Sequence, residues 1–215
     1  MTDRTDISRI RYDEGCLAAH ALNVVGDRWA LLVVRELMLV PRRFQAIRAG
    51  LPGITAAVLT QRLGQLTQSG VVTHDRATGL YALTPSGQGL LPVLQAMCRW
   101  GALHPGHDPR RFISPTALMI SMTAMIDRRA AQGLRTVAGF RSGTDSFLMR
   151  LEGDGGATVT TGAEGGEFWL EGDGNALAIA VYGPMPLTGS VASGAIHAQG
   201  DLTAAQRFID LFRLR

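Results

Sequence analysis

The sequence feature that most restricts the fold is a change of hydrophobic periodicity near residue 70. From residue 16 to residue 69, apolar side chains recur at the spacing of amphipathic helices. Residues 71–74 and 80–83 are instead two short strand-like runs, and the segment between them ends in Gly79, as in a β-hairpin. Helices followed by a short hairpin predict an α+β protein.

Glycine and proline residues divide the helical part into segments. Gly26 interrupts the first apolar run, Pro41 begins a new segment, and Gly50 ends it. Thr55 is placed to cap the next helix, and Pro85 starts one after the hairpin. The predicted helices span residues 16–25, 29–39, 41–50, 55–69 and 85–104. The first is expected to bury Leu17, Ala21, Leu22 and Val25, and the last carries an apolar stripe of Leu90, Val93, Leu94, Met97 and Trp100.

A proline-containing stretch, residues 104–115, separates this half from a second half of different character. The second half is predicted to form helices over residues 115–132, 173–183 and 202–214, and strands over residues 146–151, 157–161, 167–171 and 195–199. We therefore predict a first domain over residues 1–104, a linker over residues 105–115 and a mixed α/β domain over residues 116–215.

Composition limits the class of protein. Apolar residues make up 46% of the chain and charged residues 18%, and no apolar run approaches the ~20 residues that span a bilayer. The first residues lack the apolar core of a secretory signal, so we expect a cytoplasmic protein without membrane contact. The net charge is +3, and the arginines outnumber the acids only in the first half, as in a nucleic-acid-binding domain with an appended domain.

The two cysteines, Cys16 and Cys98, provide no disulfide framework. Cys16 and His20 lie four positions apart and share a helix face, but two ligands fall short of the four of a usual zinc site. Packing in a core or interface is the alternative for both thiols. We predict neither a metal nor a cofactor.

The helix predicted at residues 55–69 has two contrasting faces. Leu59, Leu63 and Leu66 lie on one face, which must be buried. The opposite face carries small and amide side chains: Ala57, Gln61, Gly64 and Gln68, with Thr60 and Gln65 beside them. Alanine allows close approach to a thymine methyl group and glutamine pairs with adenine, so this face suits a DNA major groove. The alternative is a helical bundle with an ordinary solvated surface.

Basic residues near this helix support a DNA-binding interpretation. Arg42 and Arg43 begin the preceding helix, where a helix N-terminus favours phosphate, and Arg62 is placed to reach a phosphate or a base edge. His74 and Arg76 lie in the hairpin, which would act as the wing of a winged helix. The predicted DNA-binding residues are Arg42, Arg43, Thr55, Ala56, Ala57, Thr60, Gln61, Arg62, Gln65, His74 and Arg76.

Residues 16–101 resemble the HxlR-type winged helix-turn-helix family, because GDRW, VRE, RRF, LPGI, VLTQRL and Y-x-LT-x-x-G follow one another in that order. The resemblance implies that residues 55–68 form the recognition helix and that dimers form through the N-terminal segment and the helix at residues 85–102. Some relatives use a cysteine matching Cys16 as a redox sensor. This chain departs from the family in having Ala57 and Gly64 where basic residues are common, and a short wing, DRATG.

Residues 115–215 resemble sterol-carrier-protein-2-like domains in the order of GATVTTG, EFWLEGD, DGNALAIAVYG and the Gly-x-Ile-x-x-x-Gly-Asp strand. Such domains hold apolar ligands in a tunnel between the sheet and the helices. The side chains expected to line a tunnel are Met119, Met122, Phe140, Phe147, Met149, Trp169 and Tyr182, and a closed core is the alternative role for the same set.

Neither half contains a nucleophile elbow, a metal-ligand pattern or a glycine-rich phosphate loop, so an enzyme is not predicted. The sequence predicts a homodimeric transcriptional regulator that binds a double-stranded DNA operator and responds to an apolar small molecule. The alternative is a lipid or acyl-compound carrier whose winged-helix domain serves only for dimerisation.

Overall fold

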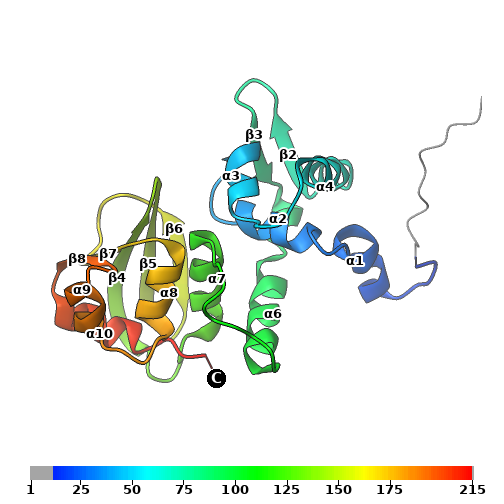
Figure 1. The fold of residues 1–215 in the computed structure, drawn as a ribbon. Coiled ribbons are helices and arrows are strands. Elements are labelled where there is room, and N and C mark those ends of the chain that lie inside the picture. Colours follow the sequence, from blue (N-terminus) through cyan, green and yellow to red (C-terminus); the bar gives the residue numbers. More distant parts are fainter. Residues whose placement is uncertain (1–11, 215) are drawn as a thin grey trace, which may run out of the picture.

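The computed structural model describes residues 12–214, and their helices and strands form two blocks (Figure 1). The first block contains a three-stranded antiparallel sheet in the order β1-β3-β2, with helices packed around it. Its elements are α1 (Leu17–Val25), α2 (Ala30–Leu37), β1 (Arg42–Arg43), α3 (Phe44–Ala49), α4 (Ala56–Gln68), β2 (Val72–Asp75), β3 (Leu80–Leu83), α5 (Pro85–Gln88) and α6 (Leu91–Leu103).

Helices α3 and α4 and the hairpin β2–β3 have the order of a winged helix-turn-helix. The turn between the two helices passes through Gly53, whose φ of +90° only glycine adopts readily. Thr55 caps α4 as predicted, because its side-chain oxygen accepts a hydrogen bond from the Val58 amide at 3.3 Å. The predicted leucine face is confirmed: Leu59, Leu63 and Leu66 are all buried in the first core.

The segment before α3 differs from the prediction. Arg42 and Arg43 were expected to begin a helix, but they form the short strand β1, and α3 begins at Phe44. Arg42 pairs with Tyr81 and Arg43 with Leu80. The free edge of β3 accepts these two residues in extended conformation, so pairing with the wing overrides the local helical pattern.

The helix predicted at residues 85–104 is two helices in the structure. Helix α5 ends at Gln88, and α6 begins at Leu91. Pro92 lies in the first turn of α6, where its missing N–H is harmless, whereas further inside a continuous helix it would break a backbone hydrogen bond. Of the predicted apolar stripe, Leu94 is buried, whereas Val93, Met97 and Trp100 are exposed.

Helix α1 lies at the edge of the first block (Figure 1). Its buried side chains are Ala19 and Val25. The expectation that Leu17, Ala21 and Leu22 pack inside the chain is wrong, because all three are exposed, Leu17 and Leu22 to 86% and 51%. Only a part of α1 therefore contacts the rest of the molecule. Within residues 12–214 no single helix has the length and hydropathy of a membrane span; α1 and α2 reach that threshold only jointly, across a 76° bend.

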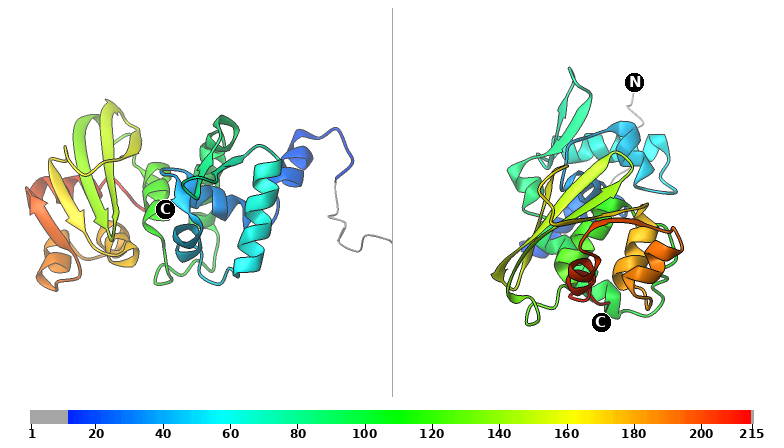
Figure 2. Two further views of the ribbon diagram at one scale, coloured as in Figure 1. Left: turned by 90° about the horizontal axis from the view of Figure 1, so that it is seen from above. Right: turned by 90° about the vertical axis from the view of Figure 1, so that its left-hand side faces the viewer.

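The second block is a five-stranded sheet in the order β6-β5-β4-β7-β8, with β4 and β7 parallel and the other neighbours antiparallel. Helices α8, α9 and α10 lie together on one face of this sheet (Figure 2). Its elements are α7 (Pro115–Met125), β4 (Gln132–Ser142), β5 (Asp145–Asp154), β6 (Ala157–Thr161), β7 (Phe168–Glu171), α8 (Gly174–Tyr182), α9 (Leu187–Ala192), β8 (His197–Gly200) and α10 (Leu202–Ile209).

Sequence periodicity missed two elements of this block. The helix predicted to run to residue 132 stops at Met125, and Gln132 already begins strand β4. The apolar alternation of β4 is weak, because Ala138 and Phe140 are its only fully buried hydrophobic residues. Helix α9 was also not predicted, and α10 ends at Ile209, earlier than expected.

Each block has a hydrophobic core of its own, and α7 links the two. The first core includes Leu37, Ile47 and Leu63, and the second is built around Phe140 and Phe208. Helix α7 packs against α2 and α6 on one side and contacts β6 and α8 on the other, and it lies between the two blocks in Figure 1. Its residue Ile120, 2% exposed, belongs to the first core rather than the second.

Candidate nucleic-acid interface

Helix α4 presents the predicted small and amide face to solvent. The exposed residues on this side include Ala56, Ala57, Thr60, Gln61 and Gln68. Thr60 donates its hydroxyl hydrogen to the Ala56 carbonyl at 2.9 Å, which leaves its methyl group and oxygen lone pairs on the surface. Because the three buried leucines anchor the other side of α4, the backbone below this face is held rigidly, as insertion into a groove requires.

Gly64 lies on the same face, and a Cβ atom built there would have no neighbour within 4 Å. A molecule that contacts this face from outside can therefore come close to the α4 backbone at Gly64. No internal packing constraint explains the absence of a side chain at this position.

Arg62 does not lie where the sequence predicted. Its Nε atom is 2.6 Å from the Asp27 carboxylate, and the side chain is only 13% exposed. The Asp27 carboxylate accepts a hydrogen bond from the Trp29 amide at 3.0 Å, at the start of α2, and Arg62 donates a hydrogen bond from its terminal nitrogen to the Gln65 side-chain oxygen. The ion pair draws Arg62 back toward the α1–α2 corner, so this arginine stabilises the orientation of α4 instead of reaching a phosphate or a base edge.

Arg42 is also engaged inside the protein. Its guanidinium is 2.7 Å from Asp145 and 2.9 Å from the Thr116 hydroxyl, both in the second block, and its side chain is 11% exposed. The expectation of a phosphate contact at Arg42 is therefore wrong, because its donors are already satisfied. Arg43, the next residue, is exposed and forms the N-cap of α3.

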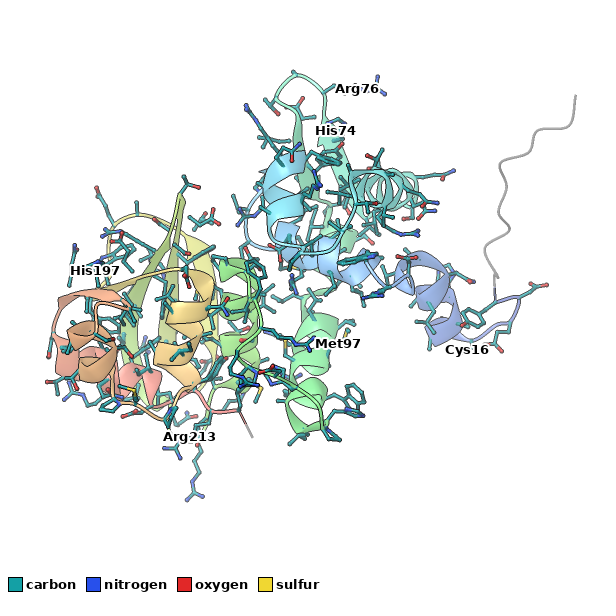
Figure 3. All side chains as sticks on the ribbon, in the orientation of Figure 1. Cys16, His74, Arg76, Met97, His197 and Arg213 are labelled. Atoms are coloured by element: carbon teal, nitrogen blue, oxygen red, sulfur yellow. The ribbon has the colours of Figure 1, made fainter. Side chains whose placement is uncertain are left out.

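The wing is a tight hairpin held by its own side chains. The Asp75 carboxylate accepts hydrogen bonds from the Ala77 amide at 2.9 Å and the Thr78 hydroxyl at 2.7 Å, and these bonds lower the pKa of Asp75. Arg76 projects from the hairpin at the top of the molecule (Figure 3). His74 stacks on Tyr81 of the opposite strand, with ring centroids 4.1 Å apart.

His74 and Arg76 lie in the hairpin as predicted, whereas the sequence did not indicate that Asp75 and Tyr81 shape the hairpin around them. A local signal existed for Asp75, because an Asp with Thr three positions later and Gly79 after it is typical of a side-chain-stabilised turn. Tyr81 begins the Y-x-LT-x-x-G motif, but the motif does not reveal that its ring stacks on His74, because that contact depends on the register of the hairpin.

The predicted ligand-lining residues of the second block are only partly brought together. Five of them, all at most 1% exposed, lie in one core: Met119, Met122, Phe140, Phe147 and Met149. Tyr182 packs at the margin of that core, and its hydroxyl is 2.8 Å from the Ser121 hydroxyl. Burial raises the pKa of Tyr182, so this phenol stays protonated well above its ordinary range.

Trp169 is not part of this group, and its assignment to the same lining is wrong. In strand β7, Phe168 and Leu170 point into the core, so Trp169 between them points to the opposite face of the sheet. There its ring lies 4.0 Å below the Arg141 guanidinium and fills the space that a side chain at residue 139 would occupy. Gly139 is therefore required for the tryptophan to lie flat on β4.

Two of the hollows formed by residues 12–214 border residues discussed above. One, of about 520 Å³, adjoins Tyr182 at the end of α8, and it is bordered by Met185 in the segment before α9 and by Phe212 and Arg213 after α10. The other, of about 720 Å³, lies between α1 and the C-terminal part of α4 and includes His20 and Gln68.

The thiols differ in their surroundings. Cys16 is exposed at the N-terminus of α1, as Figure 3 also shows, whereas Cys98 is half-buried on α6 and burial raises the pKa of its thiol. Among residues 12–214, no three His, Cys, Asp or Glu side chains are grouped as metal ligands. A redox-sensing role for Cys16 stays a prediction.

The first block is similar to known helix-turn-helix proteins. A model of the HxlR-like helix-turn-helix family matches residues 24–108. An uncharacterized HTH-type transcriptional regulator of Methanothermobacter thermautotrophicus is 32% identical over 98 residues, which are 43% of this chain and 75% of that protein. The uncharacterized HTH-type transcriptional regulator YvaP of Bacillus subtilis is 34% identical over 85 residues, which are 37% of this chain and 79% of that protein.

Among solved structures, the quinone-bound form of YodB from B. subtilis is 32% identical, with a TM-score of 0.38, and the match covers 40% of this chain and 97% of YodB. The family model ends at residue 108, so it does not extend to the five-stranded sheet and its helices. The motifs, the winged helix-turn-helix geometry and these relatives agree: the chain belongs to the HxlR-like helix-turn-helix family of transcriptional regulators.

Proposed function

We propose that the protein is a homodimeric, sequence-specific DNA-binding transcriptional regulator whose second domain binds an apolar small molecule. The observation that carries the proposal is the exposed face of α4, where small and amide side chains lie above a buried leucine stripe. A face of this composition is suited to contact with base edges, because it carries no charged side chain that would need a phosphate or solvent.

In the proposed complex, α4 enters the major groove. Ala57 lies against a thymine methyl group, and Gln61 pairs with an adenine through both amide atoms. Arg43 contacts a phosphate beside the groove, and Arg76 extends the contact along the backbone from the wing. The remaining contacts of the proposed interface come from residues around this centre: Thr55, Ala56, Thr60, Gln65 and His74.

The proposed dimer joins α1 and α6 of one copy to those of a second copy. Both helices expose large apolar side chains, and exposed apolar patches of this kind mark interaction sites. The exposed residues are Leu17, Leu22, Val93, Met97, Trp100 and Leu103. Trp100 is 67% exposed, although tryptophan is among the residues most enriched at the energetic centres of interfaces. Two recognition helices in such a dimer read half-sites about 34 Å apart, so the operator is pseudo-palindromic.

The proposed effector site is in the second domain, residues 116–215, which resembles sterol-carrier-like domains and follows a linker over residues 105–115. The hollow beside Tyr182 is the opening that this proposal uses, since five of the predicted lining residues are packed against one another in the core. An effector that binds the two states of the dimer unequally changes its DNA affinity by about 1–3 kcal/mol.

The test begins with selection of a duplex from a random pool by the full-length chain. Gln61→Ala is expected to weaken binding to the selected duplex by about 1–3 kcal/mol, the discrimination of one bidentate base contact, and to leave binding to an unrelated duplex unchanged. Arg43→Ala is expected to weaken binding to both duplexes by the same factor. It is also expected to reduce the slope of log affinity against log salt concentration by about one, because one phosphate contact is lost.

These two variants are controls for each other, because one removes a base contact and the other a backbone contact. If Gln61→Ala binds the selected duplex as tightly as the wild type, α4 does not read the operator in the proposed way. If the wild-type chain enriches no duplex, the proposed function itself is wrong.

A further inference from the structure

The second domain is hydrogen-bonded to Arg42, which lies in the strand β1 that pairs with β3 of the wing. The Arg42 guanidinium makes a two-pronged ion pair with the Asp145 carboxylate, with N–O distances of 2.7 and 3.3 Å, and also donates to the Thr116 hydroxyl at 2.9 Å. Its Nε atom donates to the Glu36 carbonyl at 3.0 Å. One side chain of the winged helix thus joins α2, α7 and the start of β5.

Arg42 is directly connected to the proposed DNA-contacting elements. It lies in β1, where its backbone pairs with Tyr81 of β3, and Tyr81 stacks on His74 of the wing. The next residue, Arg43, occupies the N-cap position of α3 and is the proposed phosphate contact. A shift of Arg42 therefore displaces the wing and the α3 N-terminus together, because both are attached to β1.

A second polar contact lies close to the first. The Glu36 carboxylate, 2% exposed, accepts hydrogen bonds from the Ser114 hydroxyl at 2.7 Å and from Arg35 Nε at 2.8 Å. Ser114 caps α7 of the second domain, so the residue whose carbonyl holds Arg42 is itself held by the second domain. These two polar contacts add to the packing of α7 on α2 and α6.

The surroundings of the ion pair make it stronger than an ordinary surface pair. Arg42 and Asp145 are 11% and 23% exposed, and Thr116 is fully buried. Paired hydrogen bonds between guanidinium and carboxylate are geometrically specific, and burial limits screening by salt. Asp145 lies outside residues 24–108, so this connection involves a part of the chain that the family model does not include.

We propose that Asp145 is a positioning residue for DNA binding: it holds β1 and the wing in the geometry that fits DNA, and it transmits rearrangements of the β4–β5 hairpin to them. The proposal rests on the proposed DNA-binding function and adds the regulatory path within the chain. An event in the second domain that displaces the hairpin end at Asp145 releases Arg42 and loosens the wing.

The test compares full-length Asp145→Asn with Glu152→Gln by amide hydrogen exchange. Both substitutions remove one negative charge from β5, but Glu152 is exposed on the far part of the strand and has no role in the junction. In Asp145→Asn, peptides covering residues 42–49 and 72–83 are expected to exchange about tenfold faster, the change that accompanies a loss of ~1.4 kcal/mol in local opening free energy. In Glu152→Gln they are expected to match the wild type.

DNA affinity provides the second readout, on the duplex selected by the wild-type chain. Loss of a negative charge by itself strengthens DNA binding, so an affinity about tenfold lower in Asp145→Asn reports loss of wing position rather than charge. Thr116→Val, which keeps the ion pair but removes the hydroxyl acceptor, is expected to shift both readouts in the same direction by a smaller factor. It also serves as the deciding variant if Asp145→Asn does not fold.

If Asp145→Asn folds and the amide hydrogen exchange rates of its wing peptides stay within twofold of the wild type, the positioning role is overturned. Unchanged DNA affinity alongside faster exchange also overturns it, because the wing position would then not matter to binding. A wild-type chain that binds no duplex refutes the proposed function separately, since the exchange measurement is made on the free protein.

Discussion

At the residue scale, the packing around Glu36 shows how a buried charge restricts its neighbours. Glu36 is held by Arg35 and Ser114, and its carboxylate occupies the space where a side chain at residue 50 would begin. Gly50 has an ordinary helical φ of −76°, so its backbone conformation does not require glycine. The requirement at Gly50 is therefore steric, and it comes from a carboxylate that cannot move without losing its partners.

The replacement Gly50→Ala is expected to lower the free energy of unfolding by about 1–3 kcal/mol, the usual cost of overpacking a core. Gly64→Ala is the matched control, because the added methyl group meets open space on an exposed helix face. That control is expected to raise stability by about 1 kcal/mol, the difference in helix propensity. Urea unfolding of the full-length chain measures both, and equal effects of the two substitutions would refute the steric role of Glu36.

At the element scale, α6 has two functions that its sequence alone does not separate. One side packs on α7, where the Gln95 side-chain amide donates a hydrogen bond to the Thr123 hydroxyl at 2.9 Å. Leu94 is buried in the first core. The other side exposes Val93, Met97 and Trp100, of which Trp100 is the most exposed at 67%. Attachment of the second domain through α7 therefore leaves the proposed dimer face of α6 open.

The substitution Trp100→Glu is expected to weaken the dimer by at least ~2 kcal/mol, about 30-fold in its dissociation constant, because tryptophan at an interface centre contributes that much or more. Sedimentation velocity over a concentration series measures the change. Leu134→Glu is the control, since Leu134 is also an exposed apolar residue, 44% accessible, but lies on β4 of the second domain. A dimer that tolerates Trp100→Glu as well as Leu134→Glu would exclude this face.

At the scale of the whole molecule, α7 makes the two blocks depend on each other. It follows the linker in sequence, yet Ile120 fills part of the first core, and Leu39 of the first block lies against both cores. A side chain supplied by one block to the core of the other couples their unfolding, because neither core is complete without the shared helix.

Replacing Ile120 with Ala is therefore expected to destabilise the winged helix, by about 2–5 kcal/mol, although the mutation lies in the second half of the sequence. Amide hydrogen exchange measures this effect, and in Ile120→Ala we expect faster exchange in peptides covering residues 30–37. Ile196→Ala removes the same atoms from the second core and is expected to leave those peptides closer to the wild type. If both variants change α2 equally, the coupling does not pass through Ile120.

Local patterns were sufficient for much of the DNA-binding half. The cap at Thr55, the buried leucines of α4 and the hairpin at residues 72–83 all follow from signals within a few residues of one another. The strand β4 was missed because its alternation is weak, and the place of Trp169 was missed because a continuous apolar run does not reveal which residues face the core.

The amino-acid sequence by itself determined which helix carries the small and amide face and where the wing lies, since helix periodicity, caps and turns depend on neighbouring residues. Only the tertiary structure decided which arginines remain free for DNA. Arg62 pairs with Asp27 and Arg42 with Asp145, and neither partner is near in sequence. Because an ion pair depends on distance in space, it emerges only when the elements that carry its two charges have packed together.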